Sequence, residues 1–88
     1  MGNAVKLEDK DTGHGSHPPT QVVTGSSTVN VDGLPLARQG DAFASHGHNR
    51  NISGGSSSVF IDGQPAARTG DAVNCGGVLI GGGSVNIG

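Results

Sequence analysis

Aromatic residues, cysteines and basic residues are all scarce in this chain of 88 residues. It contains two phenylalanines, Phe43 and Phe60, and no tryptophan or tyrosine, whereas 17 positions are glycine. A chain of this length forms one domain and buries a smaller share of its surface than a large domain does, so we expect no large apolar core. The single cysteine, Cys75, excludes an internal disulfide. A small domain without that staple needs a metal ion or a partner subunit for stability.

The low charge and the short apolar runs exclude further classes of protein. Five Lys and Arg residues against seven Asp and Glu residues give a net charge of −2, so a surface for a phosphate backbone is missing and we expect no nucleic-acid partner. The longest apolar run, at 78–80, is too short to cross a bilayer. Because residues 1–11 lack the apolar segment of a secretory signal, we expect synthesis in the cytoplasm without a signal peptide.

Most of the chain consists of one repeated pattern. The stretch GSSTVNVDGLPLARQGD at 25–41 aligns without a gap with GSSSVFIDGQPAARTGD at 55–71, and a truncated third copy, GGGSVNIG, lies at 81–88. Each full copy predicts a β-hairpin, with a strand at 28–31 or 58–61, an Asp-Gly turn, and a second strand that carries a proline. Helical periodicity is absent. We therefore predict an all-β fold with little or no helix.

A residue able to bind metal follows an aspartate at three equivalent places in the chain, four or five residues after it. His46 and His48 come after Asp41, Cys75 after Asp71, and His14 after Asp9. Repeats arranged about a pseudo-threefold axis would bring these three segments together at one end of it. Four His and Cys ligands in a tetrahedron are typical of structural zinc, and Cys75 would bind as the thiolate. The predicted ligands are therefore His14, His46, His48 and Cys75.

Two assignments have alternatives. His17 lies three residues after His14 and is an alternative ligand, but we favour His14 because His14-Gly15 repeats the ligand-then-glycine pattern of His46-Gly47 and Cys75-Gly76. Arg38 and Arg68 each precede an aspartate by three residues. Their side chains either contact a partner or hold their own repeat in shape by an Arg–Asp pair, and we favour the pair.

The stretch Pro65-Ala66-Ala67-Arg68 spells the motif of the PAAR-repeat family, and the chain resembles that family from about residue 7 to residue 88. The resemblance includes the Thr12-Gly13-His14-Gly15 start, both long repeats, the Cys75-Gly76-Gly77 segment and the final GSVNIG. It departs from the family pattern at Leu36 in place of Ala, at Glu8 where Gly often stands, and at His17.

The resemblance implies a small cone of short strands with pseudo-threefold symmetry and one structural zinc ion near its vertex. It also implies one such tip on each trimeric β-helical spike, either the valine–glycine repeat protein (VgrG) of a type VI secretion system or a phage-tail spike. We therefore expect residues 1–88 to form a single PAAR-repeat domain without an extension domain. The expected function is that of a non-enzymatic tip for envelope puncture, which contacts the target membrane transiently and is delivered outside the cell or carried in a virion tail.

Two other functions are weighed against this one. Three histidines are also typical of a zinc hydrolase, but catalytic zinc keeps an open position for water, and here Cys75 provides a fourth ligand. A fragment of a repetitive adhesin is disfavoured because the repeats are unequal.

Overall fold

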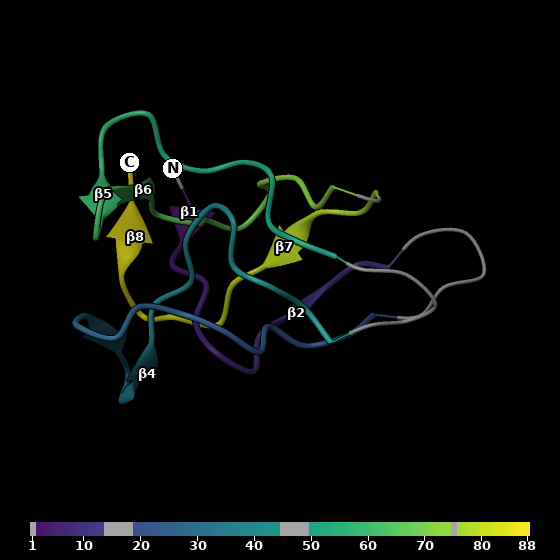
Figure 1. The fold of residues 1–88 in the computed structure, drawn as a ribbon, viewed down its shortest axis with the longest axis horizontal. Coiled ribbons are helices and arrows are strands. Elements are labelled where there is room, and N and C mark those ends of the chain that lie inside the picture. Colours follow the sequence, from purple (N-terminus) through teal and green to yellow (C-terminus); the bar gives the residue numbers. More distant parts are fainter. Residues whose placement is uncertain (1, 14–18, 45–49, 75) are drawn as a thin grey trace.

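The computed structural model describes residues 2–13, 19–44, 50–74 and 76–88 of the chain, which form four antiparallel pairs of two-residue strands and, within those ranges, no helix (Figure 1). None of these residues therefore belongs to a helix of the length and hydropathy that would cross a membrane. The strands are β1 (Gly2–Asn3), β2 (Lys10–Asp11), β3 (Asn30–Val31), β4 (Leu34–Pro35), β5 (Phe60–Ile61), β6 (Gln64–Pro65), β7 (Leu79–Ile80) and β8 (Asn86–Ile87). The all-β prediction is confirmed.

The two predicted hairpins are present, although their strands are shorter than predicted. β3 pairs with β4 and β5 with β6. Both residues of each Asp-Gly turn have positive φ, as Asp32 (52°) and Gly33 (83°) show. That geometry requires residue types that tolerate the left-handed region. β3 begins only at Asn30 because the amides of Thr28 and Val29 donate to Ser26 Oγ, over 3.1 and 3.0 Å, and close a local turn.

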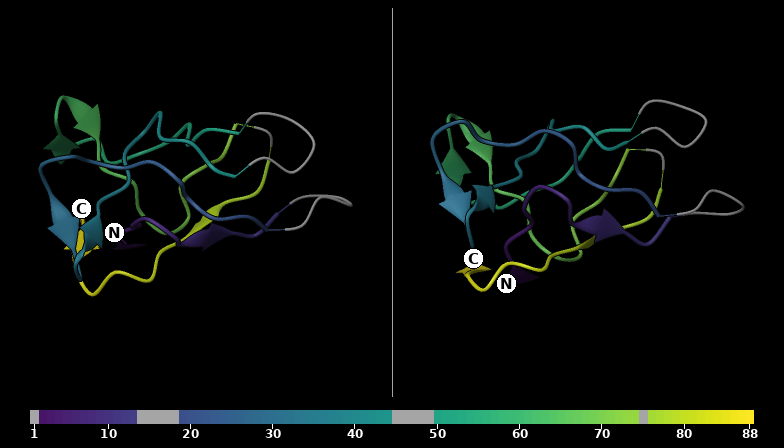
Figure 2. Two further views of the ribbon diagram at one scale, coloured as in Figure 1. Left: turned by 60° about the horizontal axis from the view of Figure 1, so that its bottom comes forward. Right: turned by 90° about the horizontal axis from the view of Figure 1, so that it is seen from below.

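The truncated third copy is completed by the start of the chain, which the sequence did not reveal. β8 pairs with β1 in the register of the hairpins, with Asn86 opposite Asn3 as Asn30 is opposite Pro35. The amide of Ala4 then donates to Val85 O over 2.7 Å. Figure 2 shows β1 and β8 side by side, near the end where the hairpins lie. Three units are therefore complete, and the segment Asn3-Ala4-Val5-Lys6 stands where the other two have Pro35-Leu36-Ala37-Arg38 and Pro65-Ala66-Ala67-Arg68.

The three PAAR-type segments form a closed triangle of backbone hydrogen bonds. Ala37 N donates to Val5 O over 2.8 Å, Ala67 N to Ala37 O over 3.1 Å, and Val5 N to Ala67 O over 3.3 Å. The side chains of all three residues are fully buried. Each segment therefore bonds to the next in rotation, which establishes the predicted pseudo-threefold arrangement.

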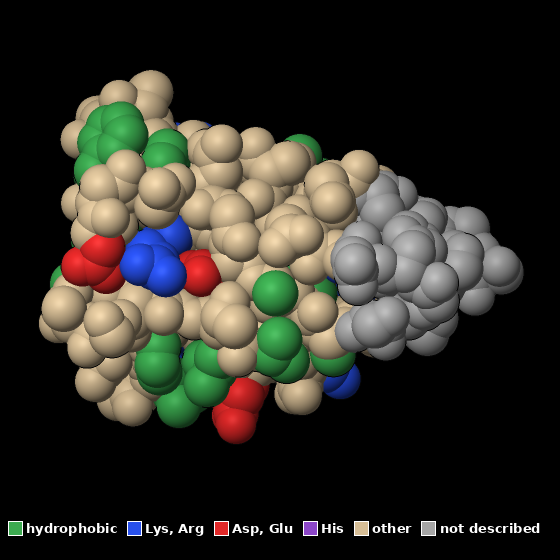
Figure 3. Space-filling model, viewed as in Figure 1, with side chains coloured by type: hydrophobic (Ala, Val, Ile, Leu, Met, Phe, Trp, Pro, Cys, Tyr) green, Lys and Arg blue, Asp and Glu red, His purple; other side chains and the backbone are tan. Residues whose placement is uncertain are grey.

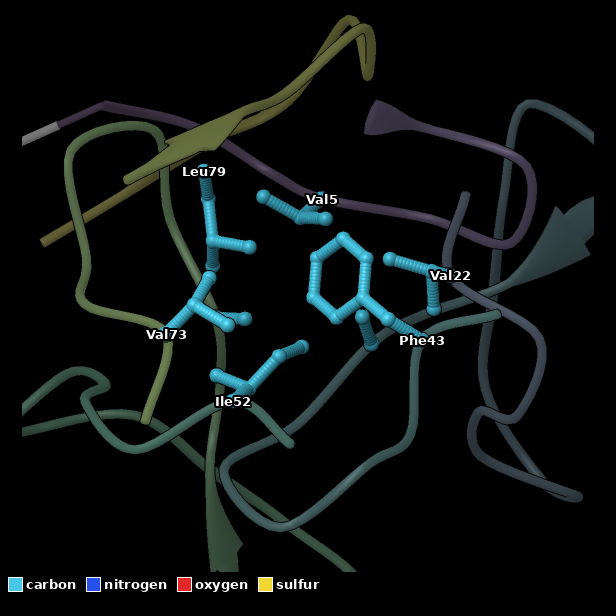
Figure 4. Close-up of a cluster of buried hydrophobic side chains, with 8 residues drawn as sticks. Val5, Val22, Phe43, Ile52, Val73 and Leu79 are labelled. Atoms are coloured by element: carbon cyan, nitrogen blue, oxygen red, sulfur yellow. The ribbon is translucent and has the colours of Figure 1, made fainter. Parts of the chain in front are cut away.

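Beyond this triangle, six short segments close into a second ring. Neighbouring segments pair in the order 9–11, 21–23, 42–44, 51–53, 72–74 and 78–80, and the last pairs with the first. Their inward side chains make up most of the core, which Figure 4 shows around the Phe43 ring. The buried apolar residues are Val5, Val22, Ala37, Phe43, Ile52, Ala67, Val73 and Leu79. A closed ring leaves no free strand edge in the middle of the molecule.

The glycine that opens each long repeat packs against the proline of the same repeat. A Cβ on Gly55 would lie 2.7 Å from Pro65 Cβ, and a Cβ on Gly25 would lie 2.9 Å from Pro35 Cβ. Any side chain at either position would collide with the proline ring or the adjoining backbone. The motif residues Pro35 and Pro65 therefore serve the packing of each hairpin onto its own repeat.

Candidate metal centre

The predicted metal ligands lie outside the described residues. His14 and the alternative ligand His17 fall in residues 14–18, His46 and His48 in residues 45–49, and Cys75 is itself outside the description. Their assignment as ligands therefore stays a prediction. Within residues 2–13, 19–44, 50–74 and 76–88, no group of three or more His, Cys, Asp or Glu side chains is placed to hold a metal ion.

The segments that carry these residues all leave the six-segment ring at one rim. At that rim three equivalent bonds recur, from Thr12 N to Val78 O (3.0 Å), Ala44 N to Gln21 O (2.8 Å) and Asn74 N to Asn51 O (3.0 Å). Each of these donors lies within two residues of a segment that carries a predicted ligand. Thr12, Ala44 and Asn74 therefore occupy matching positions around the pseudo-threefold axis beside the three segments, whose convergence on a shared site stays a prediction.

The donor set fits zinc in its chemistry. Four N and S ligands from His and Cys side chains are the kind of donor set that closed, four-coordinate structural zinc sites use. The glycines next to the predicted ligands adopt conformations that L side chains rarely adopt, with φ of 70° at Gly13 and 110° at Gly76. When bound, zinc would link three parts of the chain that are distant in sequence.

A buried ion pair lies at the same rim, and sequence reasoning missed it. One guanidinium N–H group of Arg50 donates a hydrogen bond to Asp11 Oδ2 and another donates to Thr20 Oγ1. Asp11 Oδ1 accepts a hydrogen bond from Thr20 N over 3.3 Å. The side chains of Asp11 and Arg50 are fully buried. The Arg50 guanidinium also lies 4.9 Å from the centre of the Phe43 ring, within the range of a cation–π contact. The only sequence signal was a carboxylate and a guanidinium beside the candidate segments.

The aspartates that precede these segments close a turn in each unit. Asp41 Oδ2 accepts from the amide of Arg38 over 2.7 Å, and Asp71 Oδ2 accepts from that of Arg68 over 2.8 Å. The guanidinium group of each arginine also donates to the carboxylate of that same aspartate in its own repeat, through two nitrogens. These hydrogen bonds raise the pKa of Arg38 and of Arg68 above its ordinary value. The prediction that the Arg–Asp pairs hold their repeats in shape is confirmed.

The aspartates of the hairpin turns link neighbouring units at the opposite end. Asp62 accepts hydrogen bonds from Ser26 Oγ (2.6 Å) and Thr28 Oγ1 (2.5 Å), and Asp32 accepts from the amide and hydroxyl of Ser84. Hydrogen bonding from Ser26 and Thr28 lowers the pKa of Asp62, and hydrogen bonding from Ser84 lowers that of Asp32. From the sequence these aspartates were only turn residues, and the contacts between units were not foreseen.

Together these features define a class of protein: a closed, three-unit, all-β domain whose connecting segments carry histidine and cysteine. The chain belongs to the PAAR-motif family, whose family model matches residues 12–81. A comparison with curated proteins finds no match. The family is a structural one known for metal binding, and membership implies a role at the spike tip of machines like the type VI secretion system. The matched region begins after Gly2–Asp9, the segment that completes the third unit.

Proposed function

We propose that this protein is a non-enzymatic, zinc-stabilised tip that caps a trimeric β-helical spike and sharpens it for puncture of a target envelope. The observation that supports this proposal most directly is the closed triangle of hydrogen bonds among Val5, Ala37 and Ala67. A single chain with this symmetry presents the same backbone three times. It therefore matches a threefold partner such as VgrG or a phage-tail spike, with one tip for each trimer.

The end that carries the hairpins has the properties of the docking face. A second apolar cluster lies under the hairpins, made of Ala4, Val31, Leu36, Ala66 and Ile87 with Val29, Val59 and Ile61 packed against it. Phe60 is 57% exposed and Val85 is 51% exposed. Hydrophobic side chains gather over the β5–β6 hairpin at this end in Figure 3. Apolar surface of this kind, with the unpaired outer edges of short strands beside it, favours association with another β structure.

A tip must resist deformation at the end where few residues surround one another. Structural zinc in small domains contributes an apparent ~10 to 16 kcal/mol at neutral pH, which exceeds the whole stability of many small domains. His14, His46, His48 and Cys75 would hold one ion there. The protein would be made in the cytoplasm, assembled on its spike and then delivered outside the cell or carried in a virion tail. Contact with the target membrane would be transient.

The test is reconstitution with a purified trimeric spike protein, either a VgrG or a phage-tail spike. Native mass spectrometry of the purified mixture should give one tip for each spike trimer, and a mixture of separate components would contradict the proposal. Phe60→Asp should weaken spike binding about tenfold or more, as for a central apolar contact. The matched control is Ile80→Asp, because Ile80 is similarly exposed (52%) but lies on β7 in the six-segment ring. Equal effects of the two substitutions would argue against docking through the hairpin end.

A further inference from the structure

Asp11 occupies a place in the core that the other two units fill with apolar side chains. In the six-segment ring, Asp11 pairs with Leu79 in the way that Phe43 pairs with Val22 and Val73 with Ile52. The side chains of Asp11, Phe43 and Val73 all point inward and are buried. The pseudo-threefold symmetry of the core is therefore broken at one position, by a carboxylate.

The partner of Asp11 also departs from its equivalents. Arg50, Thr20 and Gly77 each immediately precede the equivalent ring positions Asn51, Gln21 and Val78. Arg50 reaches across the rim from the second unit to contact both Asp11 and Thr20. Asp11 and Thr20 stand on either side of residues 14–18, and Arg50 directly follows residues 45–49.

The described residues that flank each candidate segment form its stem. The third stem, which follows Cys75 at Gly77, packs directly against this pair. A Cβ on Gly77 would lie 2.7 Å from Gly13 O, 3.1 Å from Thr12 Oγ1 and 3.2 Å from Asp11 Oδ2. Thr12 Oγ1 accepts from Val78 N over 3.1 Å. Gly77, two residues after Cys75, can therefore lie this close to Asp11 and its neighbours only because it has no side chain.

Stability alone does not explain a charged pair at this place. Removing two charges from water costs several kcal/mol for each ion, and replacing a buried ion pair with apolar residues of similar volume is often neutral or stabilising. Phe43 and Val73 show that apolar residues fit the equivalent positions of this ring. The pair differs from an apolar contact in its direction, because its hydrogen bonds specify where the Asp11, Thr20 and Arg50 backbones lie relative to one another.

We infer that the Asp11–Arg50 pair is a positioning device for the metal centre. It joins the stem of the segment that carries His14 to the stem of the segment that carries His46 and His48. It also places the stem that follows Cys75 against both. This inference rests on the proposed zinc site. The residues act through the ligands and do not themselves bind the metal.

The test compares the full-length chain with the variant Asp11→Val/Arg50→Met, which replaces the pair with apolar side chains and leaves the net charge unchanged. Zinc affinity is measured by competition with a chromophoric chelator, and ligand geometry by the visible absorption of the cobalt(II) form. Loss of positioning should weaken zinc binding about 10- to 100-fold, the range seen when groups that orient metal ligands are changed. It should also alter the cobalt spectrum while the metal-free protein still unfolds cooperatively.

Asp62→Asn is the control, because it disrupts a charged contact at the opposite end and should leave zinc affinity and the cobalt spectrum unchanged. If the double variant does not fold, Arg50→Lys replaces it, since an ammonium group keeps the charge but cannot bond Asp11 and Thr20 in the same fork. Unchanged affinity and spectrum in a folded variant would overturn the inference.

A second measurement separates this inference from the proposed function. In metal-free protein the Thr20 amide, which donates to Asp11 Oδ1, should exchange with solvent faster in the variant than in the wild type. A wild-type protein that binds no zinc would defeat the metal part of the proposed function. Unchanged Thr20 exchange would then show that the pair does not position the stems either.

Discussion

The backbone amide of Val5 donates to the carbonyl of Ala67 over 3.3 Å and closes a ring that the two long repeats leave open. The equivalent bonds from Ala37 to Val5 and from Ala67 to Ala37 complete the triangle. The segment Gly2–Asp9 thus serves as the PAAR-type half of the third unit, and the truncated copy at 81–88 serves as its other half. The three-unit architecture depends on both.

Val5→Asp should destabilise the protein by about 3 to 5 kcal/mol. It would place an unpaired charge in the apolar cluster that contains Val22, Phe43, Ala37 and Ala67. Chemical denaturation followed by circular dichroism measures the change. Val23→Asp is the matched control, since Val23 is 51% exposed on the outside of the same ring, and it should change stability little. Similar losses in both variants would show that the first segment is not part of the core.

Glu8→Gly should stabilise the protein by about 1 to 2 kcal/mol. Glu8 has a φ of 76° at the position where the other units have Gly40 (95°) and Gly70 (93°), and the left-handed region costs a non-glycine residue about that much. Thermal unfolding measures the gain. The reciprocal substitution Gly40→Ala should destabilise through the same backbone strain. A Cβ there would meet nothing within 4 Å, so the loss would not come from a steric clash. A stabilising Gly40→Ala would contradict this explanation.

Acid should weaken the contacts between units at the hairpin end. Hydrogen bonds from Ser26 and Thr28 hold the pKa of Asp62 below its ordinary value of 3.8. A depressed pKa in the folded state means that the contribution is complete above about pH 4 and is lost as the pH falls through the lower folded value. Asp62→Asn should therefore be less stable than the wild type at pH 7. The difference should shrink on acidification, and a constant difference from pH 7 to pH 2 would contradict the assignment.

Removing zinc should lower the thermal stability of the protein markedly, because the metal is proposed to link three segments of the chain. Elemental analysis should give one zinc ion for each chain, and treatment with a chelator should lower the melting temperature. His14→Ala should reproduce most of that loss, whereas His17→Ala should behave as the wild type. The reverse result would make His17 the ligand, and absence of stoichiometric zinc would remove the metal from the proposal.

The hairpins were predictable from the sequence because their cause is local. Asp-Gly pairs tolerate the two positive φ values of the turn, as found at Asp62 (55°) and Gly63 (82°). The spacing of His46 and Cys75 from the preceding aspartates predicts that their segments converge, which stays a prediction, while Ala44 and Asn74 just before those segments do occupy matching places in the ring. The first half of the third unit escaped notice because it is far in sequence from the truncated copy at 81–88, and because Val5, Lys6 and Glu8 replace the Ala, Arg and Gly of the other units.

The sequence by itself determined the repeat, its turns and the residues available to bind a metal ion, since each depends on residue types at short spacing. Only the tertiary structure decided how the repeats close and what fills the centre. Val5 meets Ala67, and Asp11 meets Arg50, across separations along the chain that no local pattern spans. Such contacts form because burial and hydrogen-bond satisfaction act on all segments at once, so the partner of each buried group is set by its position in space.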